Sequence, residues 1–378
     1  MKILLTDILT RKAFDIFNII KNHFDESNVI LANTEGSKKK SKIIYKKKIW
    51  ALRKDNQTVF SHDLIYINKQ YKEEKIVYIP VEEDTTILFF NFIQNEGDLN
   101  FVYLLPDKEM FNLSRDKFLL NKYCIANNIP SPVIIEKINS DFFNNNFFPL
   151  LIKPRVGSGA KGFIHIDDRK DLYKLKNIKI NNYVIQEKIE NGREVKGAFF
   201  LCNKGEVIVR YCHERIRTFP ISGGVSVFSK ISDNNEIINI GSNLLRKLNW
   251  SGFAMIEFLW DAKTKTYKVI EINPRLWGSI LLSEFAETHF LKNYVNFCLN
   301  KPTIKTKIKT DVKIRWMPFD FINWLKMRGK INNFWKIDKK HTCYINCTYA
   351  TVWSSFWFHL FFYFNKNNLQ VFFKKWKK

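Results

Sequence analysis

The sequence lacks several features that mark common classes of protein. Its first apolar segment, residues 3–5, is not followed by Gly-x-Gly-x-x-Gly, which argues against a dinucleotide site at that strand. Its six cysteines show no repeated close spacing and are interpreted as reduced cytosolic thiols. His341, Cys343 and Cys347 form a metal-like cluster, but a zinc site would need a fourth ligand and a different spacing. The N-terminus lacks the apolar region and cleavage site of an export signal, so secretion is not expected.

Acidic residues are outnumbered by basic ones, 37 to 61, and the formal net charge is +24. Such a charge on its own would suggest a polyanionic partner. However, lysine greatly outnumbers arginine, and Asn, Ile and Phe are plentiful, which together indicate an AT-rich genome. The basic residues are also scattered, apart from residues 38–48 and the last five. Nucleic acid is therefore an unlikely partner, and 378 residues with 46% hydrophobic content predict a globular protein of two or three domains.

No apolar segment reaches the roughly 20 residues that a membrane-spanning helix needs. The longest candidate, residues 350–364, has about fifteen aromatic and apolar residues around His359. Its lysine-rich flank, residues 374–378, would suit anionic lipid headgroups. A C-terminal helix docked on the core is the slightly favoured alternative. We predict a cytoplasmic protein, with a weak contact of this tail with the inner face of the membrane left open.

Residues 1–112 alternate short apolar segments with helical stretches. Segments 3–5, 29–31, 77–79 and 101–105 are expected to be buried strands, and residues 11–24 have helical periodicity. This alternation predicts a small parallel sheet with helices on its faces. We expect this domain to be a scaffold or one wall of the substrate site.

A glycine-rich hairpin is predicted in the middle of the chain. Residues 114–127 are expected to form a helix that ends at Asn-Asn-Ile-Pro-Ser-Pro. A strand at 150–154 is followed by the loop 157–162 and by a second strand at 163–166. The loop is not a Walker A motif, which requires Gly-Lys-Ser/Thr at the start of a helix. Its backbone N–H groups could bind phosphate oxygens, although a plain β-turn is an equally good interpretation.

The most informative segments are residues 252–258 and 268–275, which are expected to form a second hairpin. A register symmetric about Thr264 sets Glu257 opposite Glu271, and Glu271 and Asn273 leave the same face of their strand. Two opposed carboxylates repel unless a cation lies between them. Two acids and an amide carbonyl are oxygen ligands that Mg²⁺ accepts. A solvated acidic hairpin is the alternative, but the apolar neighbours disfavour it because a buried unpaired carboxylate is costly.

Four motifs in this order resemble the ATP-grasp superfamily, and more narrowly its carbamoyl-phosphate-synthase-like branch of carboxylate-amine ligases. They are Asp116-Lys117 before a helix, Lys153 with the glycine loop, the segment 183–194, and the acidic hairpin ending in Glu-x-Asn-Pro-Arg. The resemblance covers about residues 113–300, and Ile-Pro-Val-Glu-Glu at 79–83 adds weaker support.

This resemblance implies an α/β architecture of the α+β ATP-grasp type. It places a pre-ATP-grasp parallel α/β domain at 1–112 and a two-lobed ATP-grasp domain at 113–310, with lobes 113–187 and 188–310. Residues 311–378 then form an aromatic, basic C-terminal extension, and both residues 316–321 and the tail resemble such extensions in this branch.

The resemblance also implies roles for individual residues. Lys117 and Lys153 would reach ATP phosphates, residues 187–189 would hold adenine through backbone groups, and Glu194 would bind ribose hydroxyls. The full nucleotide-binding set is Lys117, Lys153, Gly157, Ser158, Gly159, Ala160, Gln186, Glu187, Lys188, Ile189 and Glu194. Glu257, Glu271 and Asn273 would be ligands of Mg²⁺, with two ions expected and Mn²⁺ as a substitute. For a lysine taken alone, a solvated surface position is the commoner interpretation.

Three arginines are candidate catalytic residues. The resemblance sets Arg275 against the transferring phosphoryl group, where its planar fork would hold two oxygens. Arg215 and Arg217 lie two apart on an extended segment and could both point at a carboxylate or acyl phosphate. The alternative for one of them is an ion pair with Glu214 or Glu206. The first turn lacks the family's glycines, and Lys161 and His165 have no assigned role.

The resulting prediction is a ligase that activates a carboxylate as an acyl phosphate with ATP and couples it to an amine. Its expected partners are small-molecule carboxylates and amines of amino-acid or peptide type, and a homodimer is left open. One alternative is another ATP-grasp phosphoryl transfer, although a carboxylase should bring carrier domains that the sequence lacks. A second alternative is a peripheral membrane or nucleic-acid binding protein with a degenerate nucleotide site.

Overall fold

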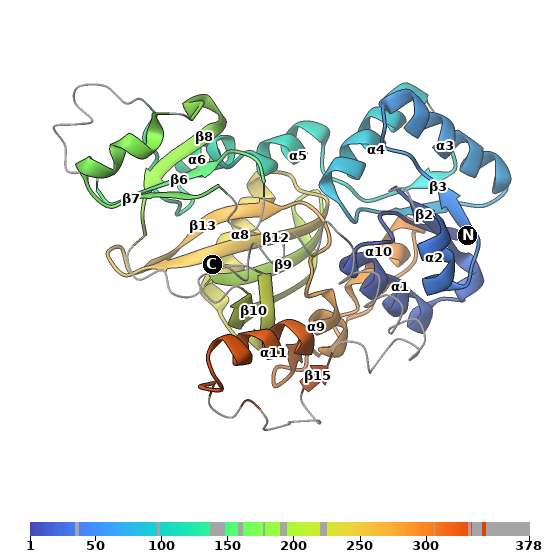
Figure 1. Ribbon diagram of the computed structural model, residues 1–378. Helices are drawn as coiled ribbons and strands as arrows, with labels where there is room; N and C mark the ends of the chain where they lie inside the picture. The colour runs from blue at the N-terminus through green and yellow to red at the C-terminus, as the bar shows by residue number, and fades with distance from the viewer. Residues whose placement is uncertain are drawn as a thin grey trace. The chain divides into compact units, whose positions relative to one another are not determined.

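The computed structural model describes residues 1–34, 38–96, 99–136, 148–157, 162–176, 178–189, 195–219, 225–305, 307–331, 334 and 342–344 (Figure 1). The chain divides into two compact units. The first comprises Met1–Leu105, Ser226–Ile231 and Arg275–Lys378, and the second comprises Pro106–Val225 and Ser232–Pro274. Both units mix helices and sheets, and the predicted α/β architecture is confirmed.

A five-stranded parallel sheet forms the N-terminal part of the first unit. Its order is β3-β2-β1-β4-β5, with β1 (Lys2–Leu5), β2 (Val29–Asn33), β3 (Ile49–Ala51), β4 (Ile76–Ile79) and β5 (Phe101–Val102). The connecting helices are α1 (Arg11–His23), the short η1 (Glu26–Asn28), α2 (Lys38–Tyr45), α3 (Gln57–Gln70) and α4 (Glu83–Glu96). Every residue of β4 is buried, as expected for a parallel sheet covered on both faces. The predicted parallel sheet is confirmed.

Local signals in the sequence explain where these helices begin. The Thr10 hydroxyl accepts a hydrogen bond from the Ala13 N–H at the start of α1, and Asn56 caps α3 through the Val59 N–H. Inside the sheet's core the Tyr78 and Phe89 rings stack with centroids 3.8 Å apart.

The first unit also contains elements from later in the chain. They are β11 (Val225–Ser232), α9 (Ile280–Phe285), α10 (Phe290–Cys298), β14 (Lys313–Arg315), α11 (Met317–Lys326) and β15 (Thr342–Tyr344). β14 pairs antiparallel with β11 and parallel with β15. The buried Arg315 donates to Asp320 at 2.5 Å and lies over the Phe334 ring, so this charge is compensated within the unit.

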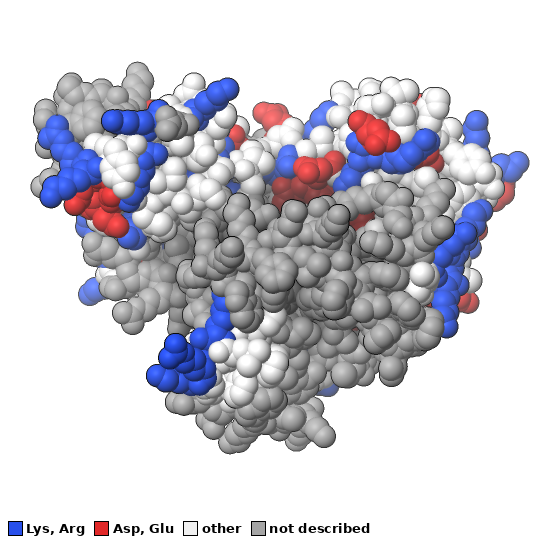
Figure 2. All heavy atoms as spheres, viewed as in Figure 1, with Lys and Arg blue, Asp and Glu red and all other residues white. Residues whose placement is uncertain are grey.

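The predicted C-terminal tail lies outside the described residues, both at the aromatic segment 350–364 and at the basic end 374–378. Among the helices that the structure describes, none has the length and apolar composition required to cross a membrane. On the face shown in Figure 2, the Lys and Arg atoms of the described residues lie in separate groups among acidic and uncharged atoms.

The second unit begins with two helices and a small sheet. Helix α5 (Lys108–Arg115) ends before α6 (Lys117–Ala126), so the single helix predicted over 114–127 is wrong at its start. Asp116 separates the two helices because its backbone is extended and its carboxylate caps α6 through the Phe118 and Leu119 N–H groups. The small sheet has the order β7-β6-β8, with β6 (Leu150–Pro154), β7 (Ile164–Ile166) and β8 (Tyr183–Glu187), and is joined by the short helices η2 (Arg169–Leu175) and η3 (Ile180–Asn182). The predicted hairpin of β6 and β7 is confirmed.

Four antiparallel strands form the larger sheet of the second unit. They run in the order β13-β12-β9-β10, with β9 (Val195–Asn203), β10 (Glu206–Phe219), β12 (Gly252–Asp261) and β13 (Thr266–Asn273). One face of this sheet packs on α8 (Asn235–Lys247) and α6 in a core that includes Ala198, Phe200, Ile256 and Ile272. Because side chains alternate along a strand, the residues directly before and after each of these four in its strand project from the opposite face.

Candidate active site

The predicted pairing of the two carboxylates is confirmed. Glu257 on β12 lies opposite Glu271 on β13, and Met255 lies opposite Asn273. The symmetric register fails closer to the turn, where Phe258 lies opposite Val269 and Ile270 is an extra residue on β13. This irregularity is a β-bulge, in which two residues of one strand face one residue of its partner.

The bulge decides which side chains of β13 are buried in the core. With strict alternation from Ile272, the core-facing positions would be Ile270 and Lys268. The extra residue instead lets Val269 join Ile272 in the core, while Lys268 takes the other orientation. The bulge therefore keeps a lysine out of the apolar layer and leaves Glu271 on the opposite face.

The register places four residues in one row across the sheet. Glu271 pairs with Glu257, Glu257 with Gly197, and Gly197 with His213. Directly paired residues share a face, so this row lies on the face opposite α8. Arg215, two residues beyond His213, shares that face and forms an ion pair with Glu257 rather than with the predicted alternatives Glu214 or Glu206.

Gly197 and His213 are site residues to which sequence reasoning assigned no role. A Cβ at Gly197 would lie 2.9 Å from the Phe199 ring and 3.1 Å from the His213 ring, so only glycine fits between them. His213 is 1% exposed, and neither of its ring nitrogens has a hydrogen-bond partner among the described residues. Burial and then the nearby Arg215 lower the pKa of His213 to about 3, so its ring is neutral. In the sequence, the spacing of His213 and Arg215 indicates only that both side chains share one face of a strand. The pairing of β10 with β9 is needed to show that this face is the one that carries Glu257.

Lys117 connects the glycine-rich loop to the acidic hairpin. Its Nζ lies 3.2 Å from Glu271 Oε2 and donates a hydrogen bond of 2.6 Å to the Gly157 carbonyl. The Asn273 amide donates to the other oxygen of Glu271 at 3.2 Å. Burial alone would raise the pKa of Glu271, but Lys117 and Lys153 outweigh it and hold the pKa below its usual value. The carboxylate is therefore ionised and surrounded by cations.

Lys153 on β6 is 1% exposed. Its Nζ makes a long hydrogen bond of 3.5 Å to the Ile270 carbonyl, at the bulge of β13. Burial lowers the pKa of Lys153 to about 8, although the attraction of Glu271 opposes this effect. Two lysines from α6 and β6 therefore converge on the acidic hairpin.

The three predicted metal ligands form a set that fits Mg²⁺. Glu257 and Glu271 face each other across two strands, and Asn273 touches Glu271. Carboxylate and amide oxygens are the ligands that Mg²⁺ prefers, usually beside nucleotide phosphates. The cationic groups of Lys117, Lys153 and Arg215 already lie around the carboxylates. The acidic ligands of the row thus lie beside cationic side chains that are suited to binding phosphate oxygens.

The predicted adenine hinge follows β8. The backbone N–H groups of Glu187 and Lys188 donate to the Val133 and Pro149 carbonyls, and Gln186 is buried on the same strand. Ile189 is half-buried. The hinge backbone is thus fixed to residues that precede β6.

Glu187 is also held by its side chain. Lys268, which the sequence did not single out, lies 2.6 Å from Glu187 and 2.8 Å from Asp261. A lysine between the apolar residues Tyr267 and Val269 was the signal for this pair. The carboxylate of Glu187 serves the scaffold, so any contact of this residue with adenine would use its backbone.

Four of the predicted nucleotide-binding residues lie outside the described part of the chain: Ser158, Gly159, Ala160 and Glu194. Arg217 is half-buried on β10, two residues beyond Arg215. The zinc cluster that the sequence disfavoured, at residues 341–347, has no described side chains.

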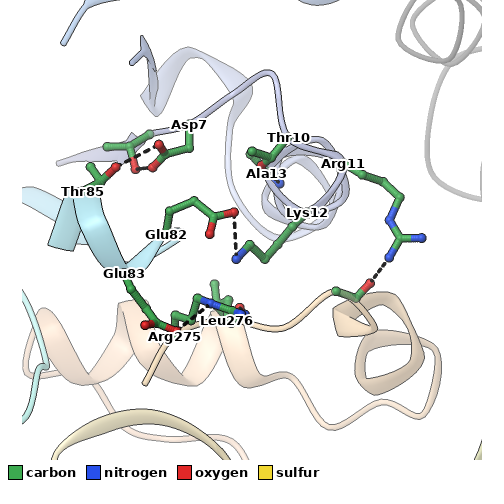
Figure 3. A network of polar contacts seen from close by, with 12 residues as sticks. Asp7, Thr10, Arg11, Lys12, Ala13, Glu82, Glu83, Thr85, Arg275 and Leu276 are labelled. Atoms are coloured by element: carbon green, nitrogen blue, oxygen red, sulfur yellow. Dashed lines mark hydrogen bonds and ion pairs between the residues drawn. The ribbon is translucent and has the colours of Figure 1, made fainter. Parts of the chain in front are cut away.

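Arg275 belongs to the first unit, because the second unit ends at Pro274. Its Nε lies 3.3 Å from Glu83, and Lys12 lies 3.0 Å from Glu82 (Figure 3). Burial and then Arg275 lower the pKa of Lys12 to about 8. Figure 3 shows Glu82 directed at Lys12 of α1, and Glu83, the first residue of α4, directed at Arg275. The phosphoryl role of Arg275 stays a prediction.

The hairpin of β6 and β7, the converging lysines and the acidic hairpin are the features from which the sequence predicted an ATP-grasp domain. Residues 114–279 match the family model of the ATP-grasp domain, and the resemblance stated from the sequence is confirmed. Comparison with curated proteins found no significant match.

Three solved structures show the same fold at low sequence identity. The biotin carboxylase domain of Hydrogenobacter thermophilus 2-oxoglutarate carboxylase, a dimer in complex with MgADP and bicarbonate, matches with TM-score 0.62 and 12% identity over 82% of this chain and 73% of that one. The L-amino acid ligase of Bacillus licheniformis matches with TM-score 0.57 and 14% identity over 83% and 78%. Rhizobium etli pyruvate carboxylase matches with TM-score 0.61 and 15% identity over 83% of this chain, which spans only 30% of that protein.

Proposed function

We propose that this protein is an ATP-dependent carboxylate-amine ligase. The observation that carries the proposal is the convergence of Lys117 and Lys153 on Glu271, opposite Glu257 on one face of the sheet. Buried lysines beside paired carboxylates suit an ATP-grasp site that binds phosphates together with Mg²⁺. The similarity to an L-amino acid ligase supports amino-acid or peptide-like substrates.

The proposed reaction needs activation because a free carboxylate is a poor electrophile. The substrate carboxylate would attack the γ-phosphorus of ATP, breaking its bond to the β–γ bridging oxygen and releasing ADP. The amine would then attack the acyl carbon of the acyl phosphate, and inorganic phosphate would leave with the former carboxylate oxygen. An amide bond forms, and the amine nitrogen gives up a proton to solvent.

The chain's own residues would position and neutralise the phosphates. Lys117 and Lys153 would bind phosphate oxygens, and Arg215 would bind the substrate carboxylate or the acyl phosphate. Glu257, Glu271 and Asn273 would hold Mg²⁺, which supplies neutralisation of the β- and γ-phosphate charge when bound. The proposal includes two ions, with Mn²⁺ as a substitute, and assigns Arg217 and Arg275 as further anion-binding groups. The lobes 113–187 and 188–310 would enclose the nucleotide.

Thermal unfolding with and without Mg-ATP tests the proposal. Glu271→Ala removes a metal ligand, whereas Glu206→Ala removes an exposed carboxylate on β10 and is the matched control. A ligand that binds only the folded state raises its melting temperature, so wild type and Glu206→Ala should shift and Glu271→Ala should not. ADP release over a panel of amino acids would then identify the carboxylate and the amine.

Equal shifts in all three proteins would contradict the assignment of Glu271. Failure of the wild type to bind or hydrolyse Mg-ATP, combined with sedimentation on anionic vesicles, would instead support the membrane-binding alternative.

A further inference from the structure

Two histidines and a glutamate come together in the first unit, in a cluster that the ligase proposal does not use. His23 is the last residue of α1, Glu284 lies in α9, and His289 immediately precedes α10. One ligand atom from each residue lies within 4.8 Å of the other two. The His23 Nε2 atom contacts a carboxylate oxygen of Glu284 directly. Three separate helical segments therefore converge on one point.

The His289 ring is the member of this cluster with an unmet hydrogen-bonding need. Its Nδ1 is buried, and within the described part of the chain it has no hydrogen-bond partner. The ring packs edge-on against His23, with centroids 5.3 Å apart. A buried polar atom without a partner costs free energy, so this nitrogen is expected to meet a partner that the polypeptide does not supply, either water or a bound ion.

The backbone at His289 is held in an unusual conformation. Its φ is 53°, in the left-handed region, and its side chain makes no cap for α10. Among residues other than glycine, Asn, Asp and His are the ones most often found in this region, so an asparagine can replace the histidine there without a change of backbone. The His289 side chain is therefore not used as a cap of α10 and is directed to the cluster with His23 and Glu284 instead.

The chemistry of the three groups identifies a class of ligand. Two imidazole nitrogens and one carboxylate oxygen are the protein ligands of many zinc sites that keep a fourth position for water. Mg²⁺ prefers oxygen ligands alone, so this cluster differs in kind from the acidic hairpin of the second unit. Burial lowers the pKa of His289, with attraction to Glu284 opposing and His23 adding to the effect, and the neutral ring is the form that binds metal. The charges closest to His289 are Glu284, Lys292 and Glu287, with His23 beside them.

We propose that His23, Glu284 and His289 bind a divalent transition metal, with Zn²⁺ as the best match. The ion ties the end of α1 to the turn between α9 and α10. In a tetrahedral site with ligands about 2.0–2.2 Å from the metal, ligand atoms lie roughly 3.3 Å apart. The direct contact between His23 and Glu284 would therefore open slightly as the ion enters, and the third ligand would come from His289.

Metal titration of the full-length, chelator-treated protein tests this proposal. Co²⁺ should produce the visible absorption of a tetrahedral site, and equilibrium dialysis with Zn²⁺ should give one ion per chain. His289→Asn and His23→Asn should each weaken Zn²⁺ binding roughly 100-fold, since each removes one of three ligands. Asn tolerates the left-handed conformation at position 289, so that variant should fold.

Matched controls separate this site from adventitious binding. His62→Asn removes an exposed histidine of α3 in the same unit and should leave the stoichiometry and the spectrum unchanged. A variant with His341→Ala, Cys343→Ser and Cys347→Ser should do the same. Circular dichroism and melting temperature in chelator establish that each variant is folded, and Glu284→Gln provides a variant of nearly equal volume.

The proposal is overturned if the wild type binds no Zn²⁺ or Co²⁺, or if folded His23→Asn, His289→Asn and Glu284→Gln retain wild-type affinity. Both outcomes are independent of ATP, because the measurement requires no nucleotide.

Discussion

Two buried lysines, one in each unit, carry nearly the same electrostatic penalty and meet it differently. Burial lowers the pKa of Lys12 and that of Lys153 to about 8. Lys12 has a carboxylate partner, Glu82, at 3.0 Å, whereas the described hydrogen bond of Lys153 is a long one of 3.5 Å to a backbone carbonyl. The close ammonium partner of Glu271 is Lys117. Lys12 thus has a carboxylate partner within the scaffold, whereas Lys153 is placed where an anionic ligand would complete its environment.

The size of the penalty makes this difference informative. A lysine pKa lowered from 10.5 to about 8 corresponds to roughly 3 kcal/mol of unfavourable free energy for the charged form. A site that keeps such a lysine without a close carboxylate sacrifices stability, which is common where binding requires it. A bound phosphate would recover much of the loss by supplying the missing negative charge.

The largest expected effect is on nucleotide binding. Lys153→Met should weaken Mg-ATP binding about 100-fold, because a desolvated charge-assisted bond to phosphate is lost. Lys12→Met should change this affinity by no more than about twofold, since its charge is paired with Glu82. Isothermal titration calorimetry of both variants measures the difference. Comparable losses in the two variants would show that the comparison between the lysines is wrong.

The next effect is on stability and its pH dependence. Because the pKa of Lys153 is lower in the folded state than in the unfolded state, the unfolded state binds more protons between about pH 8 and 10.5. The penalty is therefore complete below pH 8, and it is relieved as the pH rises through that range. Lys153→Met should be more stable than wild type by up to about 3 kcal/mol at pH 7, and this gain should shrink towards pH 10.5.

Urea unfolding of wild type and Lys153→Met at several pH values checks this expectation, because the difference between them cancels the titration of other groups. Lys12→Met is the control for a paired lysine and should gain less at pH 7, since its removal leaves the partly buried Glu82 carboxylate without its ammonium partner. A difference between wild type and Lys153→Met that is constant from pH 7 to 10.5 would contradict the inferred pKa.

The sequence was sufficient to predict features that depend on local spacing. Alternating apolar segments predicted the parallel sheet, and the short polar loop between residues 257 and 271 predicted that two carboxylates face each other. The bulge at Ile270 was not predictable, because it depends on burying Val269 and Ile272 together against α6 and α8. The predicted helix bounds 114–127 disregarded Asp116, although the motif of Asp116-Lys117 before a helix already indicated a start at Lys117, where Asp116 caps α6.

In the candidate site, too, the features that depend on contacts between residues far apart in the sequence could not be predicted. Lys117, Lys153, Glu257 and Glu271 could be proposed from motifs, but the row that includes Gly197 and His213 follows from the pairing of four strands. The cluster of His23, Glu284 and His289 joins residues that are 261 positions apart at its direct contact. Nothing in the local sequence relates them, so only the fold could bring this group to light.

The smallest expected effect is that of alanine substitution at two glycines, Gly197 and Gly241. These glycines lie on opposite faces of the larger sheet of the second unit, as the two lysines lie in different units. An added Cβ at Gly197 would meet the Phe199 ring at 2.9 Å on the face of the carboxylates. An added Cβ at Gly241 on α8 would meet the Phe200 ring at 2.7 Å on the core face. Each alanine should lower stability by about 1–3 kcal/mol through overpacking, partly offset at Gly241 by better helix propensity.

Only Gly197→Ala should also weaken Mg-ATP binding, because the displaced His213 ring lies in the row of Glu257 and Glu271. Chemical unfolding gives the first quantity for each variant, and calorimetric titration gives the second. If Gly241→Ala weakened Mg-ATP binding as much as Gly197→Ala at equal loss of stability, the effect would reflect general softening of the sheet. The glycine variants would then give no support for a difference in role between the face that carries Glu257 and Glu271 and the face that packs on α8. This conclusion would hold independently of the results for the lysine variants.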